Sequence, residues 1–115
     1  MSNPVVHFEI MGRDSAKLAN FYSGLFGWKI DANNPMNYGL VDTGSGAGIP
    51  GGIGQEPDGK PRVTVYVQVD DLQNYLDEAV ARGGTLLMPV TEIPGAVTMA
   101  MFSDPDGNAV GMIKG

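Results

Sequence analysis

Two side chains with acid-base chemistry stand two residues apart near the start of the chain. His7 and Glu9 alternate with apolar residues over 4–11, a pattern typical of a strand that buries one face. Side chains two apart on a strand point to the same side, so we expect the imidazole and the carboxylate to be neighbours. If both face a desolvated cavity, the pair can act as a general base. The structural alternatives are a histidine hydrogen-bonded to Glu9 or Thr64, and a solvated or salt-bridged Glu9.

A second polar set occupies a later strand. Thr64, Tyr66 and Gln68 alternate with the valines of the segment 62–69. This alternation predicts that the valines, including Val63 and Val65, form a core face and that the polar side chains form the opposite face. A tyrosine on such a face can donate a hydrogen bond to a ligand carbonyl or phenol.

The two strands are equivalent because the chain contains an internal repeat at one constant offset. His7 matches Thr64, and Asp14 matches Asp71. A repeat unit that cannot close its own core must pair with its twin, and the paired sheets leave a concave space for small ligands. We therefore predict a single domain over residues 1–115. Its parts are module one at about 4–54, a linker at about 55–61 and module two at about 62–115.

Each copy reads as a strand, a helix and further strands. Asp14 or Ser15 is expected to cap the first helix and Asp70 or Asp71 the second. Apolar stripes at helical spacing predict the core-facing sides, and glycines end both helices. The first stripe is Leu18, Phe21, Tyr22 and Leu25, followed by Gly27; the second is Leu72, Tyr75, Leu76, Ala79 and Val80, followed by Gly83 and Gly84. The remaining strands are expected at 28–31, 38–42, 49–54, 85–88, 96–103 and 109–114.

Composition excludes several classes of protein. A formal net charge of −6 with no Lys/Arg cluster disfavours nucleic acid and anionic lipid as partners. No apolar run approaches the roughly 20 residues that span a bilayer, and no export leader is evident. The absence of cysteine rules out thiolate chemistry and disulfides. We expect a cytoplasmic protein.

Two short motifs and the repeat together resemble a known superfamily. The motifs are Phe21–Trp28, which reads FYSGLFGW, and Ser103–Asn108, which reads SDPDGN. With two βαβββ modules they resemble the vicinal oxygen chelate superfamily of glyoxalases, bleomycin-resistance proteins and extradiol dioxygenases. The resemblance implies an α+β fold in which two tandem βαβββ modules form paired curled sheets around a central cavity, and frequently a homodimer.

The resemblance also implies where a metal would be bound. Its four ligand positions fall on His7, on Thr64, on Gly111 and within the segment 51–54. Only His7 among these is a metal ligand, whereas a divalent ion needs three or more. We therefore expect no metal and no other cofactor. The alternative is an unusual site in which Glu9 joins His7.

The predicted function is metal-independent binding of a small, partly apolar organic molecule. It would serve sequestration or proton transfer by His7 and Glu9, the candidate catalytic residues. Thioethers adapt to irregular ligands, although core filling is the alternative role for methionine. The predicted ligand-binding residues are His7, Glu9, Thr64, Tyr66, Gln68, Met99 and Met101. Other readings are a glyoxalase- or dioxygenase-type metalloenzyme with a degenerate site, and a non-catalytic structural or regulatory dimer. For a ligand-binding Glu9 we expect replacement to abolish binding at little cost in stability.

Overall fold

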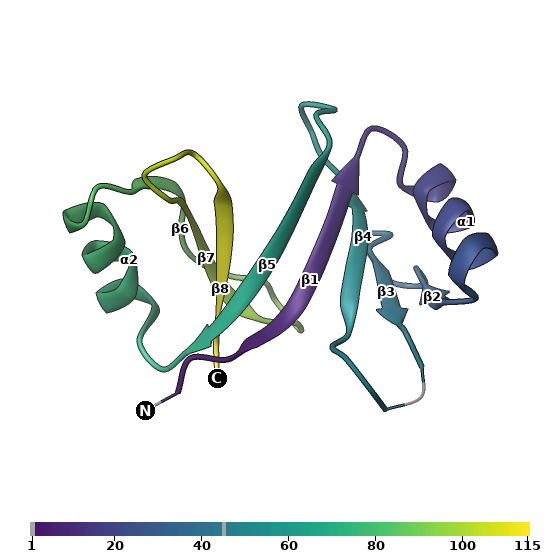
Figure 1. Ribbon diagram of the computed structural model, residues 1–115, viewed down its shortest axis with the longest axis horizontal. Helices are drawn as coiled ribbons and strands as arrows, with labels where there is room; N and C mark the ends of the chain where they lie inside the picture. Colours follow the sequence, from purple (N-terminus) through teal and green to yellow (C-terminus); the bar gives the residue numbers. More distant parts are fainter. Residues whose placement is uncertain (1, 45) are drawn as a thin grey trace. The chain divides into compact units, whose positions relative to one another are not determined.

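The structure is a computed structural model that describes residues 2–44 and 46–115 (Figure 1). The chain forms two compact units, which we call the first unit, residues 7–63, and the second unit, residues 64–115 together with the N-terminal residues up to Val6. Each unit packs one helix against its strands, so the predicted α+β architecture of two βαβββ modules is confirmed.

The first module begins with a long strand and a helix. Its elements are β1 (Val5–Gly12), α1 (Ser15–Phe26), β2 (Lys29–Asp31), β3 (Gly39–Asp42) and β4 (Gly51–Gln55). The strand order is β2-β3-β4-β1, with β1 parallel to β4 and the other neighbours antiparallel.

The second module repeats this plan. Its elements are β5 (Arg62–Val69), α2 (Leu72–Ala81), β6 (Thr85–Glu92), β7 (Thr98–Ser103) and β8 (Ala109–Lys114). The order is β6-β7-β8-β5, with β5 parallel to β8. The N-terminal segment joins this unit, because the backbone N–H of Gln68 donates to the carbonyl of Pro4 at 2.8 Å.

Matching caps confirm the repeat at the level of hydrogen bonds. Asp14 and Asp71 have extended φ angles of −135° and −132°, and each side chain accepts from the backbone N–H three residues later at 3.1 Å. These contacts satisfy donors that a helix N-terminus leaves unpaired. Gly27 ends α1 at φ 72°, the left-handed conformation predicted for it.

The core of the second module differs from the predicted core in one respect. Val69 and its neighbours pack under α2, but Val63 and Val65 are 74% and 41% exposed. Thr64 and Tyr66, on the face predicted to be polar, are buried. The helix contacts the valines at the carboxyl end of β5, and its ten residues leave the earlier ones uncovered. The alternating pattern therefore identified the two faces, but it misassigned burial along the strand.

Helix α1 also turns a different side to its sheet than its apolar stripe predicts. Phe21 and Leu25 are 59% and 60% exposed, whereas Tyr22 is half-buried. Trp28 accounts for this orientation, because its ring stacks on that of Tyr22 with 5.5 Å between the ring centroids. The centroid of the Phe8 ring of β1 lies 5.6 Å from that of Trp28. These aromatic contacts attach α1 to β1 through Tyr22, which lies at one edge of the apolar stripe. Among the described residues, no helix combines the length and the apolar character needed to cross a membrane.

Candidate functional site on the first unit

The strand register of the first unit gathers polar side chains on the face turned away from α1, which we call the open face. Glu9 of β1 pairs with Gly52 of β4, Gly52 with Leu40 of β3, and Leu40 with Asp31 of β2. Residues in register point to the same side of a sheet. His7 precedes Glu9 by two residues and therefore shares this face.

A cavity of about 500 Å³ lies on the first unit beside these residues. Apolar contributions come from Ile30, Leu40 and Pro50, and His7 lines it as well. The remaining lining residues are Lys29, Asp31, Val41, Asp42 and Gly51. The volume suits a small organic molecule, and a mostly apolar lining with a few polar groups is usual for such sites.

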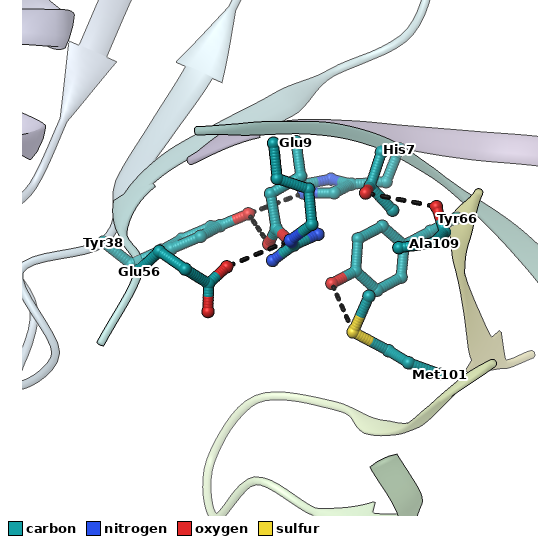
Figure 2. Close-up of polar contacts among 9 residues, drawn as sticks. His7, Glu9, Tyr38, Glu56, Tyr66, Met101 and Ala109 are labelled. Carbon is teal, nitrogen blue, oxygen red and sulfur yellow. Dashed lines mark hydrogen bonds and ion pairs between the residues drawn. The ribbon is translucent and has the colours of Figure 1, made fainter. Parts of the chain in front are cut away.

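A tyrosine from outside β1 joins the two predicted catalytic residues (Figure 2). The hydroxyl of Tyr38 donates to Oε2 of Glu9 at 2.7 Å, and its oxygen lies 3.0 Å from Nε2 of His7. The imidazole and phenol rings are stacked, with 22° between their planes. The three side chains therefore form one hydrogen-bonded chain, in which Tyr38 occupies the middle.

The turn before β3 holds Tyr38 in place. The side-chain oxygen of Asn34 accepts from the backbone N–H of Tyr38 at 3.0 Å, and its amide nitrogen donates to the carbonyl of Tyr38 at 2.6 Å. Asn37 adopts a left-handed φ of 52°, which asparagine tolerates better than most residues. Local side-chain contacts thus replace strand pairing just before the sheet begins.

Arg62 forms ion pairs with two carboxylates of the same unit. Its Nη2 lies 3.0 Å from Oε1 of Glu9, and its Nε lies 3.0 Å from Oε2 of Glu56. The side chains of Arg62 and Glu9 are only 21% and 9% exposed. Burial by itself lowers the pKa of Arg62, but hydrogen bonding to Glu56 and the charge of Glu9 raise this pKa above its ordinary value. The guanidinium is therefore a permanent cation beside Glu9.

His7 is held in its neutral form. Burial lowers its pKa below the ordinary value of 6.5, and the negative charge of Glu9 only partly opposes this shift. A neutral imidazole at neutral pH has one nitrogen that donates and one that accepts. The arrangement can thus accept a proton from a bound molecule, which is the chemistry predicted for this pair.

The residues of the site do not fit a metal ion. A Cβ atom at Gly52 would overlap the Tyr38 hydroxyl, and one at Gly111 would overlap the ring of Tyr66. Aromatic rings thus fill the space at positions where the resemblance implies metal-binding side chains. Both oxygens of Glu9 are engaged, one by Tyr38 and one by the cation of Arg62. Within residues 2–44 and 46–115, no three His, Asp or Glu side chains gather in a way that could hold an ion.

The other predicted ligand-binding residues share one face of the second unit. Tyr66 and Met101 both pair with Gly111, whereas Gln68 and Met99 both pair with Ile113. The Tyr66 hydroxyl lies 3.9 Å from the sulfur of Met101 (Figure 2). Ligand roles for this set remain predictions.

Thr64 makes an internal contact within the same unit. It is buried, and its hydroxyl donates to the carbonyl of Ala109 at 3.3 Å. This bond links β5 to the start of β8, so the contact has a structural role.

Sequence reasoning missed three residues of the site, namely Tyr38, Glu56 and Arg62. The glycines of β4 were the available signal, because a bare strand beside polar neighbours leaves room for a ring. From the sequence, those glycines indicated only that a metal ligand is missing from this strand. Arg62 and Glu56 lie next to or within the segment predicted to be a linker.

Comparison with known proteins places the chain in a family. Residues 5–112 match the model of the Glyoxalase/Bleomycin resistance protein/Dioxygenase superfamily. The chain therefore belongs to this superfamily, as its repeat and two motifs indicated.

Individual relatives agree with this assignment. The chain is 33% identical over 115 residues to CFP32 of Mycobacterium tuberculosis, whose name assigns it provisionally to the glyoxylases, with 90% of this chain and 42% of that protein covered. It is 30% identical over 119 residues to DnrV, an anthracycline biosynthesis protein of Streptomyces peucetius, with 89% and 43% covered. The chain thus spans less than half the length of these relatives.

Solved structures show the same fold. A superfamily member from Vibrio splendidus aligns with a TM-score of 0.65 at 15% identity, covering 99% of this chain and 100% of the other. The Mn(II)-bound glyoxalase of Novosphingobium aromaticivorans aligns with a TM-score of 0.66 at 14% identity, covering 98% and 40%. Identities this low establish the fold alone.

Proposed function

We propose that the protein binds a small, partly apolar organic molecule on the open face of its first unit, without a metal ion. The observation that carries this proposal is the chain from His7 through Tyr38 to Glu9 beside a cavity of about 500 Å³. A half-buried set of hydrogen-bonded polar groups beside a cavity with apolar walls supplies both orientation and affinity for a small ligand. Sequestration and reversible proton transfer both use this arrangement.

The relatives support a small-molecule ligand. One is named as a glyoxylase and another as a protein of anthracycline biosynthesis, and both names point to small organic compounds. The net charge of −6 argues against nucleic acid or an anionic membrane as the partner. A chain without cysteine fits the cytoplasm, which we propose as its location.

Metal analysis tests the first part of the proposal. Protein purified without chelator should contain far less than one equivalent of zinc, iron, nickel or manganese. A content near one metal per chain that disappears in His7→Ala would contradict the proposal and favour a degenerate metalloenzyme.

Ligand screening tests the second part. Metal-free protein is screened by thermal shift against small aromatic and carbonyl compounds, since a ligand that binds only the folded state raises the melting temperature. We expect hits whose shift is lost in Tyr38→Phe and kept in Tyr75→Phe. Tyr75 is a matched control, because its hydroxyl contacts Asn3 within the second unit. Hits that are equally strong in Tyr38→Phe would place the ligand elsewhere.

We also propose a homodimer. Strand β6 stands at the end of the strand order, and Leu86 and Leu87 on it are 49% and 52% exposed. A long edge strand with apolar side chains is a pairing liability that a partner can cover. Light scattering at micromolar concentration should give twice the chain mass, and a monomer at all concentrations tested would refute the proposal.

A further inference from the structure

We propose that Tyr38 fixes the proton of His7 on Nε2, so that Nδ1 is the basic nitrogen of the imidazole. Donors and acceptors in the two contacts, His7 to Tyr38 and Tyr38 to Glu9, can be assigned by counting their hydrogens. The phenol of Tyr38 has a single hydrogen, whereas an ionised carboxylate has none to give. Glu9 therefore accepts the phenol hydrogen in the 2.7 Å contact.

The remaining contact then has only one possible direction. Because the phenol hydrogen is committed to Glu9, the Tyr38 oxygen can only accept in its 3.0 Å contact with His7. Nε2 must carry the hydrogen in that contact. Neutral imidazole has one N–H, so Nδ1 holds the lone pair.

The ion pair of Glu9 with Arg62 supports the premise that the Glu9 carboxylate has no hydrogen to donate. Nη2 of Arg62 lies 3.0 Å from the second oxygen of Glu9, so the carboxyl group meets a cation on one side and a donor on the other. A protonated carboxyl group would place its hydrogen against one of these two donors. Through its ion pair with Glu9, Arg62 thus sets the donor-to-acceptor direction of both hydrogen bonds, from His7 to Tyr38 and from Tyr38 to Glu9.

This arrangement prepares His7 to receive a proton without rearrangement. When Nδ1 takes a proton from a ligand, the electron pair of the broken bond stays on the ligand and His7 becomes a cation. Nε2 continues to donate to Tyr38, which continues to donate to Glu9. The two carboxylates Glu9 and Glu56 exceed the one cation Arg62 by one negative charge, which offsets the imidazolium. No proton has to move along the hydrogen bonds between His7, Tyr38 and Glu9. The ligand regains its proton from Nδ1 when the step reverses.

The basicity of this nitrogen implies a ligand class, and this implication rests on the proposed function. The ligand should carry an acidic O–H or an enolisable C–H group that can lose a proton to a neutral imidazole. Charged groups near His7 include Glu9 on its own strand, Arg62 and Glu56, of which Arg62 is ion-paired with both glutamates, and Lys29, Asp31 and Asp42 around the cavity. The two aspartates outnumber the lysine, which favours a ligand that arrives neutral rather than as an anion. Tyr38 is a positioning residue in this scheme.

The test uses nitrogen NMR of the ligand-free protein, so its outcome is independent of ligand binding. His7 is the only histidine in the chain, and its two ring nitrogens can be assigned without overlap in uniformly ¹⁵N-labelled protein. At pH 7.5 we expect the shifts of an Nε2–H tautomer. A dominant Nδ1–H tautomer in the wild-type protein would overturn the inference, even if ligand screening succeeds.

Two variants separate positioning from a merely structural role. Tyr38→Phe removes the acceptor, so a measurable fraction of Nδ1–H tautomer should appear. Glu9→Gln removes the charge that opposes the lowering of the His7 pKa, so this pKa should fall further. Tyr75→Phe serves as the control and should leave both the tautomer and the pKa of His7 unchanged.

Each variant also has an outcome that counts against the inference. An unchanged tautomer in folded Tyr38→Phe, or an unchanged His7 pKa in Glu9→Gln, would show that Tyr38 and Glu9 do not act on His7. If Tyr38→Phe fails to fold, the wild-type tautomer and the Glu9→Gln titration still decide the matter.

Discussion

The hydroxyl of Tyr38 occupies the space in which a side chain at Gly52 would begin. A Cβ atom there would overlap the phenol oxygen, although the backbone of Gly52 is not in the left-handed region. Space rather than conformation therefore requires glycine at this position. Tyr66 lies over Gly111 in the same manner, and a ring that covers a bare strand position restores packing that glycine lacks. Both modules thus use an aromatic ring against their last strand.

The first prediction concerns Gly52→Ala. The added methyl must displace the Tyr38 ring and break its contact with Glu9, so the variant should lose about 1–3 kcal/mol of unfolding free energy. Gly24→Ala is the matched control, because Gly24 lies within α1, has no positive φ, and has open space where a Cβ would stand. That control should be stabilised by about 0.4–1 kcal/mol. Urea unfolding measures both, and equal effects would contradict the close approach of Tyr38.

The second prediction compares two arginines that each contact a glutamate. Arg62→Met leaves Glu9 without its cation in a buried position, so we expect a loss of about 1–3 kcal/mol. Arg82 pairs with Glu78 at 2.7 Å on the surface, where the two side chains are 77% and 54% exposed. Arg82→Met should therefore cost no more than about 0.5 kcal/mol. If the two variants lose the same stability, the burial of the Arg62 pair has no energetic consequence.

The third prediction is coupling between Glu9 and Arg62. Glu9→Ala and Arg62→Met should each be destabilising, because Arg62→Met leaves the buried Glu9 without its cation and Glu9→Ala removes one of the two carboxylates that pair with Arg62. The double variant should lose clearly less stability than the sum of the two, since it removes both charges. Additive losses in a double-mutant cycle would show that the pair does not interact. This expectation for Glu9→Ala differs from the one drawn from the sequence for a ligand-binding Glu9, and it follows the salt-bridged alternative that the sequence left open.

The sequence predicted the fold because local patterns determine most of it. The caps at Asp14 and Asp71 and the strand 109–114 follow from residue types within a few positions of each other. The candidate site, by contrast, depends on contacts between residues that are far apart in the sequence. Tyr38 reaches Glu9 across 29 positions of sequence from a turn, where no alternation indicates the direction of a side chain. Periodicity shows which residues of one strand share a face, but it does not show which side chain from another element covers them.

Burial was the other quantity that the sequence could not supply. Val63 and Val69 stand on one side of β5 and have the same side chain, yet one is 74% exposed and the other 3%. The difference depends on where α2 lies along the strand. A strand pattern contains no information on this, since the ten residues of α2 rise only about 15 Å whereas the eight residues of β5 extend about 26 Å.

The last prediction is that His7 makes stability depend on pH between neutral and mildly acidic conditions. Burial lowers the His7 pKa in the folded protein below the value of 6.5 that applies to the unfolded chain. The unfolded state therefore binds more protons as the pH falls through 6.5, and the free energy of unfolding decreases until the lower folded pKa is passed. Wild-type protein should be less stable at pH 5.5 than at pH 7.5 in urea unfolding, and His7→Gln should lose this part of the dependence. The pKa of Asp104 is lowered below 3.8 by hydrogen bonds from Asn108, so its contribution is lost only at more acidic pH. A His7→Gln variant that keeps the full slope between pH 7.5 and 5.5 would show that His7 is not buried as a neutral base.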